Sequence, residues 1–298
     1  MISFKELIQY AKTIGKKRCV VVCAEDEAIL EGTQLAYDLG LISPVLVGDK
    51  EKITKLAKDV QFDVGLCEIH DAHSDSEALA KAISLVKEKG DFLMKGMLSS
   101  SAFLKGVLNK EWGLRAGKIL SHVAAFEIPD YHKLLYMSDG GVNVKLDLKT
   151  RIEIIKNAVD ALGKIGINHP KIGLVAASET VNPDIPETVD AVEIVKMNRA
   201  GKITGCTIDG PFGFDVAVSK KAAVIKNIES LVTGEVDFVL MPNISAANIW
   251  AKGLMYFANT KGAGMVVGAQ RPIIMLSRAD DPATKLNSIA LGVIISDN

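Results

Sequence analysis

Hydrophobic positions along the chain alternate between short apolar runs and stretches with helical spacing. Phe4, Leu7, Ala11 and Ile14 repeat at helical intervals, and the apolar run that follows them, 18–24, is typical of a buried strand. The same alternation recurs through most of the sequence. A repeated strand–helix order predicts an α/β fold in which helices cover both faces of a largely parallel sheet.

This pattern assigns elements to the whole chain. The predicted helices are 4–14, 27–39, 52–58, 77–89, 148–162, 189–197, 216–228, 246–257 and 283–290. The predicted strands are 18–24, 44–47, 66–69, 92–94, 119–126, 133–137, 172–176, 206–208, 238–240, 265–267, 273–276 and 293–295. The alternation is interrupted between 118 and 145, so we expect two lobes. The first is 1–145 plus 263–298, and the second is 146–262.

Charge and composition narrow the class of protein. Lys and Arg number 35 against 36 Asp and Glu, which leaves no basic excess, and we therefore expect no nucleic-acid partner. No apolar run approaches the ~20 residues of a membrane-spanning helix, and the stretch from Met1 to Gly15 lacks the apolar block of a signal peptide. The four scattered cysteines suit a reducing compartment. Together these features predict a cytoplasmic protein with no membrane partner.

Common cofactor motifs do not occur in the sequence. The first predicted strand leads into Glu25-Asp26-Glu27 instead of the glycine-rich turn of a dinucleotide-binding fold, and there is no P-loop pattern. His70 and His73 lie near two aspartates, but no third histidine or cysteine stands at ligand spacing. We therefore expect neither a metal site nor a bound dinucleotide.

Four predicted strands end in polar residues, and ligands of open parallel sheets bind beyond the carboxyl ends of strands. The first of these ends runs from Lys95 to Ser100 and Ser101, at the start of a helix that contains Lys105. Serine hydroxyls and free N–H groups at a helix start can hold an anion. A run of helix-capping serines is an equally good interpretation.

The second and third strand ends lie in the second predicted lobe. Asp209-Gly210-Pro211 follows a strand and is first of all a turn, with substrate binding as its second interpretation. The third strand end leads into a helix that contains Asn248 and Lys252. These two residues are four apart, so they share one face of that helix. Taken alone, they are more simply interpreted as solvated surface residues.

The fourth strand end, from Ser277 to Asp281, is the most informative. A hydroxyl, the guanidinium of Arg278 and two carboxylates, one of them Asp280, leave a single strand within five residues. Arginine binds phosphate with two parallel hydrogen bonds, a hydroxyl can stabilise an oxyanion, and a carboxylate can accept a proton. The pattern favours a catalytic site over a salt-bridged loop, with Ser277, Arg278 and Asp280 as the catalytic residues.

Several separated motifs follow one another from about residue 90 to the C-terminus. They are Val107–Arg115, Leu120–Val123, Asn182-Pro183 with Pro186, Asp209–Pro211 with Asp215, Asn248-Ile249 with Lys252, Val266–Ala269 with Pro272, and Ser277–Asp280. In residues and order these motifs resemble those of the phosphate acetyl/butyryltransferase family, and the first of them is similar to the butyryl-type branch in particular.

The resemblance implies two α/β lobes with an architecture like that of isocitrate and isopropylmalate dehydrogenases, and an active site in the cleft between them. It implies the reaction acyl-CoA + phosphate ⇌ acyl phosphate + CoA on a butyryl-like chain, by direct attack in a complex of both substrates. Coenzyme A is then a substrate, no cofactor or metal is needed, and the protein is a homodimer or a larger homo-oligomer. The substrate-binding residues are expected to be Ser100, Ser101, Lys105, Asp209, Gly210, Pro211, Asn248 and Lys252.

The chain departs from the family's pattern in ways that leave alternatives open. Acetyl-type members carry a cysteine two residues after the arginine and an aspartate, proposed as the thiol base, six after it; here Asp280 and Thr284 stand there. Asp280 or Asp281 can take the role of the base, and Lys105 replaces the usual arginine without its bidentate fork. The alternatives are an acetyl-specific transferase, a metal- and nicotinamide-dependent decarboxylating dehydrogenase, and a non-catalytic CoA-binding protein.

Overall fold

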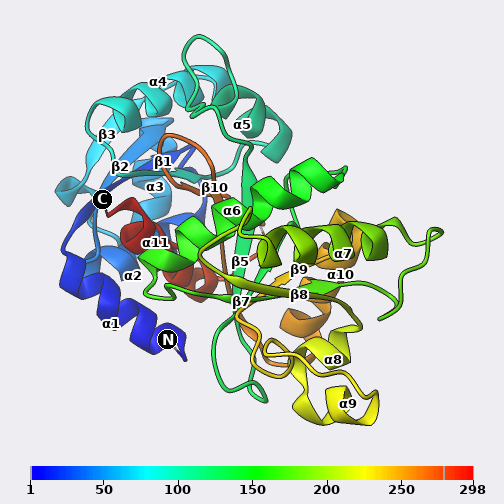
Figure 1. Ribbon diagram of the computed structural model, residues 1–298. Coiled ribbons are helices and arrows are strands. Elements are labelled where there is room, and N and C mark those ends of the chain that lie inside the picture. Colours follow the sequence, from blue (N-terminus) through cyan, green and yellow to red (C-terminus); the bar gives the residue numbers. More distant parts are fainter. Residues whose placement is uncertain (1, 278, 298) are drawn as a thin grey trace. The chain divides into compact units, whose positions relative to one another are not determined.

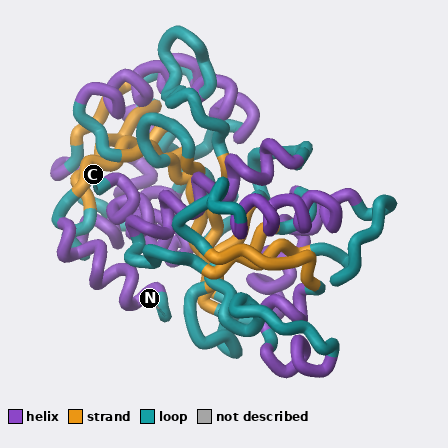
Figure 2. The backbone as a smooth tube through the Cα atoms, viewed as in Figure 1, coloured by secondary structure: helices purple, strands orange, loops and turns teal. Residues whose placement is uncertain are grey.

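The chain forms two compact units (Figures 1 and 2). The structure, a computed structural model, describes residues 2–277 and 279–297. The split unit comprises the described residues of Phe4–Lys118 and Ala263–Asn298, and the central unit comprises Ile119–Gly262 with the described residues of Met1–Ser3. Residues 119–145 were expected in the first lobe, and that boundary is wrong, because strands within this segment pair with strands of the central unit.

The split unit alternates strands and helices as the sequence predicts. Its helices are α1 (Phe4–Ile14), α2 (Glu27–Asp38), α3 (Lys50–Asp59), α4 (Asp75–Glu88), α5 (Ser100–Val107) and α11 (Pro282–Ser296), with a short 3-10 turn at Val64–Leu66. Its strands are β1 (Lys17–Val22), β2 (Ile42–Gly48), β3 (Glu68–Asp71), β4 (Phe92–Lys95), β11 (Ile273–Ile274) and, from Ala263 onward, β10 (Lys261–Val267).

The strand order of the split unit, β3-β2-β1-β4-β11-β10, creates a reversal point beside β1. Strand β1 pairs in parallel with β2 on one side and with β4 on the other, and β4 pairs in parallel with β11. The chain first builds outward from β1 through β2 and β3 and then returns to the opposite side of β1 to form β4. At such a reversal point the loops after the strands diverge and open a crevice at the carboxyl ends, where ligands bind in open α/β sheets.

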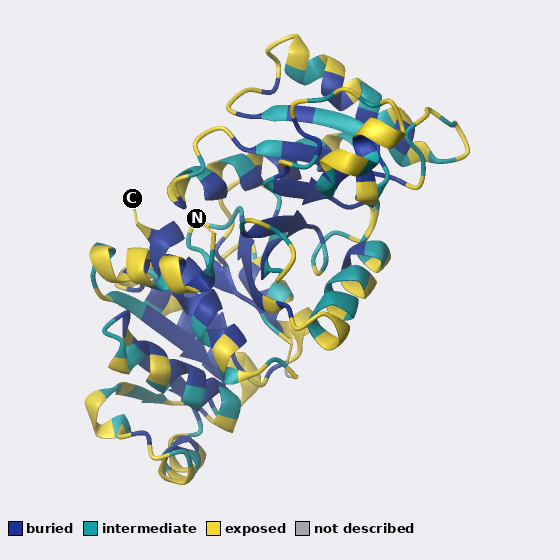
Figure 3. Ribbon diagram, turned by 90° about the horizontal axis from the view of Figure 1, so that it is seen from below, coloured by how far each residue is buried: buried dark blue, intermediate teal, exposed yellow. Residues whose placement is uncertain are grey.

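Helices bury this sheet from both sides (Figure 1). Right-handed crossovers place α2 and α4 on opposite faces; α4 packs on β1, β2 and β4, whereas α2 packs on β2 and on α11. Figure 3 shows the result, with buried strands in the interior and exposed positions on the outer faces of the helices.

Helix α11 is buried at nearly every position from Thr284 to Ser296. The strand predicted at 293–295 is therefore wrong, since these residues belong to the C-terminal part of α11. An apolar run that is buried on all sides has no amphipathic period, so its spacing does not distinguish a helix from a strand.

The central unit is a mixed sheet covered by helices. Its helices are α6 (Leu148–Lys164), α7 (Pro186–Arg199), α8 (Phe214–Val218), α9 (Lys220–Ile225) and α10 (Ile244–Phe257). Its strands, in the order β5-β6-β9-β7-β8, are β5 (Ser121–Glu127), β6 (Leu135–Ser138), β9 (Phe238–Leu240), β7 (Lys171–Val175) and β8 (Thr207–Phe212). Strand β5 runs antiparallel to β6, and the other neighbours are parallel.

The helix predicted at 216–228 is in fact two short helices, α8 and α9. Ser219 separates them because its extended backbone ends α8 while its Oγ accepts the Ala222 N–H at 3.3 Å and caps α9. None of the helices within residues 2–277 and 279–297 has both the length and the apolar character needed to cross a membrane.

Candidate active site

The carboxyl ends of β1, β4 and β11 surround a small cavity of about 10 Å³ at the reversal point of the split unit. The cavity joins the first and the fourth polar strand ends identified in the sequence, which lie far apart along the chain. Its lining residues are Asp26 and Ile29 at the start of α2, Lys95 at the end of β4, Gly96 and Met97 after it, Leu276 and Ser277 after β11, and Lys285 on α11.

Ser277 begins a tight turn that ends at Asp280. The Asp280 N–H donates to the Ser277 carbonyl oxygen at 3.2 Å, and the Ser277 N–H donates to Asp280 Oδ2 at 2.9 Å. The Ala279 N–H donates to Ser277 Oγ at 3.4 Å. Ser277 is exposed, so this turn presents a hydroxyl to solvent at the rim of the cavity. Arg278, which was predicted to hold the phosphate, lies outside the described residues.

Helix α11 begins directly after this turn, and hydrogen bonds from its first residues hold the turn in place. Asp281 is the N-cap, and its Oδ1 accepts the Thr284 N–H at 2.7 Å. Lys285 is only 1% exposed, and its Nζ donates to the carbonyl oxygen of Asp280. Burial lowers the pKa of Lys285, while the negative charges of Asp26, Asp280, Asp281 and Glu31 act in the opposite direction. Sequence reasoning missed Lys285; the available signal was a lysine within the apolar sequence of the last helix.

The end of β4 and the loop after it form another part of the cavity lining. Lys95 is 4% exposed, and its Nζ donates to two main-chain carbonyl oxygens of its own loop, each at 3.1 Å. Gly96 lies so close to β1 that a Cβ atom there would be 2.0 Å from the carbonyl oxygen of Cys23. The Gly96 N–H donates to the Val22 carbonyl oxygen at 2.8 Å, and the Met97 N–H donates to that of Cys23 at 2.9 Å. Only glycine permits this close approach.

The serine run after this loop caps a helix. Ser99 Oγ accepts the Ala102 N–H at 3.1 Å and is the N-cap of α5, so the capping interpretation is confirmed for Ser99. Ser100, Ser101 and Lys105 are exposed on α5. Substrate binding by these three residues stays a prediction.

Asp209, Gly210 and Pro211 lie inside strand β8, so the turn predicted for them is wrong. The strand continues to Phe212 in parallel pairing with β7. It passes through the Gly-Pro pair because Gly210 has a φ of +142°, which glycine adopts without steric cost. Asp209 Oδ1 accepts the Gly210 N–H at 3.0 Å and lies 3.5 Å from Arg199, while Pro211 is buried. A substrate contact by these residues stays a prediction.

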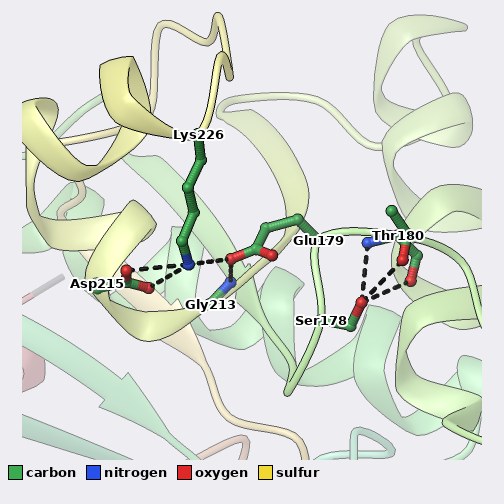
Figure 4. Close-up of polar contacts among 6 residues, drawn as sticks. All are labelled: Ser178, Glu179, Thr180, Gly213, Asp215 and Lys226. Carbon is green, nitrogen blue, oxygen red and sulfur yellow. Dashed lines mark hydrogen bonds and ion pairs between the residues drawn. The ribbon is translucent and has the colours of Figure 1, made fainter.

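Asp215 belongs to a charged cluster at the carboxyl ends of β7 and β8 (Figure 4). Lys226 Nζ lies 2.7 Å from Glu179 Oε1 and 3.0 Å from Asp215 Oδ2, and the Gly213 N–H donates to Glu179 Oε1 at 3.3 Å. The two carboxylates raise the pKa of Lys226, and Lys226 lowers the pKa of each carboxyl. The cluster therefore ties the loop after β7 to the turn before α8.

Asn248 and Lys252 are exposed on α10, as their helical spacing predicts. Asn248 Nδ2 donates to the carbonyl oxygen of Gly140 at 3.3 Å. Gly140 belongs to a loop organised by the buried carboxylate of Asp139, whose Oδ1 accepts the Gly141 N–H at 2.9 Å. Sequence reasoning did not identify this buried carboxylate.

The chemistry that the cavity in the split unit can supply rests on hydroxyl, ammonium, carboxylate and main-chain N–H groups. Burial raises the pKa of the neighbouring Cys23 thiol to about 12, so this thiol stays protonated at neutral pH and is a poor nucleophile. Within residues 2–277 and 279–297, no group of three or more His, Cys, Asp or Glu side chains is arranged to hold a metal ion. The available groups suit binding and transfer of an anionic substrate.

The whole chain is similar to proteins of known family. Residues 76–293 match the model of the family described as "Phosphate acetyl/butaryl transferase". The phosphate butyryltransferase of Clostridium acetobutylicum is 40% identical over 297 residues, which cover 99% of both chains. The phosphate acetyltransferase of Thermotoga maritima is 35% identical over 292 residues, which cover 98% of this chain and 99% of that protein.

Solved structures agree with these relationships. A branched-chain phosphotransacylase from Enterococcus faecalis has a TM-score of 0.83 at 26% identity and covers 95% of this chain and 99% of its own. A phosphotransacetylase from Streptococcus pyogenes has a TM-score of 0.80 at 17% identity, with 99% of each chain covered, and supports the fold alone. The resemblance inferred from the sequence is confirmed, and the chain belongs to the phosphate acetyl/butaryl transferase family of acyltransferases.

Proposed function

We propose that the protein transfers a short acyl group between coenzyme A and phosphate, with a four-carbon group preferred: butyryl-CoA + phosphate ⇌ butyryl phosphate + CoA. The observation that carries the proposal is the cavity in which the exposed Ser277 meets the buried ammonium groups of Lys95 and Lys285, since this combination suits anionic oxygens. The relatives at 39–40% identity are named phosphate butyryltransferases, which favours the four-carbon group over the acetyl group.

The reaction proceeds by direct attack within a complex of both substrates. A phosphate oxygen attacks the thioester carbonyl carbon, and the tetrahedral oxyanion then collapses as the C–S bond breaks. CoA leaves as a thiol, with the proton that the attacking phosphate gives up. Ser277 donates a hydrogen bond to the oxyanion, and Arg278 holds the phosphoryl group. In the reverse direction a carboxylate accepts the thiol proton. We assign this role to Asp280, which lies in the same turn as Ser277, whereas Asp281 caps α11. Holding both substrates in place supplies much of the rate without a covalent enzyme intermediate.

The proposal extends to architecture and assembly. We include in the proposal an architecture like that of isocitrate and isopropylmalate dehydrogenases; likeness to 4-hydroxythreonine-4-phosphate dehydrogenases, with a TM-score of 0.60 at 13% identity, supports a dehydrogenase-like fold. A homodimer or larger homo-oligomer is supported by α10, which leaves Ile249, Tyr256 and Phe257 72%, 70% and 93% exposed. A cytoplasmic location is supported by four free cysteines.

The test is CoA release from acetyl-, butyryl- and isobutyryl-CoA, with and without added phosphate. We expect phosphate-dependent release that is fastest with the four-carbon groups. Faster release from acetyl-CoA would support the phosphate acetyltransferase alternative. Binding of CoA without release from any substrate would support a non-catalytic CoA-binding protein. Arg278→Ala is expected to lower turnover by orders of magnitude with an unchanged thermal transition, and near-normal turnover in that variant would contradict the assigned site.

A further inference from the structure

Lys285 is a buried ammonium that the surrounding protein only partly satisfies. Its side chain has three N–H donors, and its single hydrogen bond goes to the carbonyl oxygen of Asp280. In the part of the chain that the structure describes, no carboxylate oxygen lies within the 4.0 Å of an ion pair with Lys285 Nζ. Two donors of a charge that is 1% exposed thus have no protein acceptor among these residues.

The carboxylates near Lys285 are committed to other partners. Asp26 Oδ1 accepts the Ile29 N–H at 2.9 Å as the N-cap of α2, and Asp281 caps α11. Asp280 Oδ2 accepts the Ser277 N–H. Burying a charge without a direct partner is unfavourable, so a buried ammonium beside a cavity is a candidate for binding an anionic ligand.

The packing of α11 on α2 holds this lysine in place. A Cβ atom at Gly32 of α2 would lie 2.7 Å from the Cβ of Lys285, so the absence of a side chain at Gly32 makes room for the lysine stem. The stem is therefore confined between two helices, which fixes the direction in which the ammonium group lies.

A second buried ammonium lines the same cavity. Lys95 comes from β4, the strand next to β11, and is 4% exposed. Both lysines line the same small cavity, so an anion bound there would be attracted by two positive charges. The cavity of about 10 Å³ has room for roughly one water-sized group, which is also the size of one oxygen of a phosphate.

We propose that Lys285, together with Lys95, binds one oxygen of the substrate's phosphate group, in addition to the contact predicted for Arg278. The remaining phosphate oxygens lie at the rim of the cavity beside the exposed Ser277. The identity of the anion rests on the proposed function, whereas the anion site itself rests on the two buried lysines and the cavity.

The test is Lys285→Met, which keeps the length of the side chain and removes the charge. We expect the KM for phosphate to rise about ten- to hundredfold, because a hydrogen bond between charged groups is lost, while the KM for acyl-CoA stays nearly unchanged. We also expect an unchanged or higher Tm, because an uncompensated buried charge is removed. A lysine with a purely structural role would give the opposite pattern, a lower Tm with an unchanged KM for phosphate.

Lys133→Met is the matched control. This lysine of the central unit has an 18% exposed side chain, and its Nζ lies 2.6 Å from Asp237 Oδ1. Its removal breaks a direct ion pair, so we expect a lower Tm and an unchanged KM for phosphate.

Binding of inorganic phosphate, measured by calorimetry on the full-length wild type and on Lys285→Met, separates this inference from the proposed function. If the wild type releases no CoA but binds phosphate in a Lys285-dependent way, the proposed function fails and the anion site stands. If the wild type turns over and Lys285→Met keeps its KM for phosphate, the anion site is overturned. Should Lys285→Met not fold, Lys95→Met tests the same cavity, and an unchanged KM for phosphate in that variant overturns the proposal.

Discussion

Asp280 and Asp281 are adjacent in sequence, and we predict that their substitutions have opposite consequences. Asp281→Ala removes the 2.7 Å hydrogen bond to the Thr284 N–H and the negative charge at the start of α11. Loss of an N-cap costs about 1 kcal/mol, and loss of the charge at the helix start adds about 0.3–1 kcal/mol. The free energy of unfolding should therefore fall by about 1–2 kcal/mol, which lowers the Tm by roughly 2–3 °C in a chain of this size. Turnover well below the Tm should be nearly unchanged.

Asp280→Asn should do the reverse. The asparagine side chain keeps an oxygen that can accept the Ser277 N–H, so we expect the turn and the Tm to be preserved. It loses the ability to accept the thiol proton, and removal of a general base typically lowers turnover by about 10²–10⁴-fold.

Two measurements on each variant decide this assignment: CoA release at saturating substrate, and thermal unfolding. Asp281→Asn serves as the control, because asparagine is also a good N-cap and should keep the Tm close to that of the wild type. Loss of turnover in Asp281→Ala with normal turnover in Asp280→Asn would invert the assignment. Normal turnover in both variants would show that neither carboxylate is the base.

Three further predictions concern the turn, the β4 loop and a buried thiol. Ser277→Ala should lower turnover by about 10²–10³-fold, as loss of one oxyanion donor does, with an unchanged Tm; CoA release and thermal unfolding check this, and normal turnover would remove Ser277 from the mechanism. Gly96→Ala places a Cβ atom against main-chain oxygen and should lower the free energy of unfolding by about 3 kcal/mol in urea titrations, whereas the control Gly163→Ala, in a helix with open space around it, should raise it by about 0.5–1 kcal/mol. Equal stability of these two variants would contradict the close approach at Gly96. Burial raises the pKa of Cys206 to about 11 from the 9.0 of an exposed thiol, so the unfolded chain loses this proton first and stability should fall as the pH rises from 9 to 11. Urea midpoints across this range should fall less steeply in Cys206→Ala, and parallel curves would refute the burial effect.

Local pattern was sufficient to predict most of the fold. The apolar run at 18–24 became β1, and the stretch at 77–89 became α4, which begins after Ser74 because that side chain accepts the Glu77 N–H. These elements are set by their own sequence, through burial and capping. Two predictions failed because the local sequence does not determine these elements. Residues 293–295 form a helix and Gly210 lies in a strand, and both depend on packing against neighbouring elements.

The candidate site was predictable only in part. The polar strand ends at Lys95 and Ser277 stood out because polar residues directly followed apolar runs, and the structure brings both to one cavity. Lys285 did not stand out, because its burial depends on the contact between α11 and Gly32, more than 200 residues apart in the sequence. The sequence alone likewise could not decide whether Asp280 or Asp281 is the general base, because the N-cap hydrogen bond of Asp281 is seen only in the structure.

The split unit also has a consequence for the order in which the protein is made. The residues of β1–β4 leave the ribosome well before β11, which pairs with β4, and before α11, which packs on α1 and α2. Until then the apolar surfaces of α1 and α2 that α11 will cover have no partner, and the nascent chain presents them to chaperones and proteases. The cavity with its two lysines can form only after Lys285 has emerged. A chain whose synthesis stops before α11 therefore cannot acquire the anion site, and the surfaces of α1 and α2 that α11 covers stay without that partner.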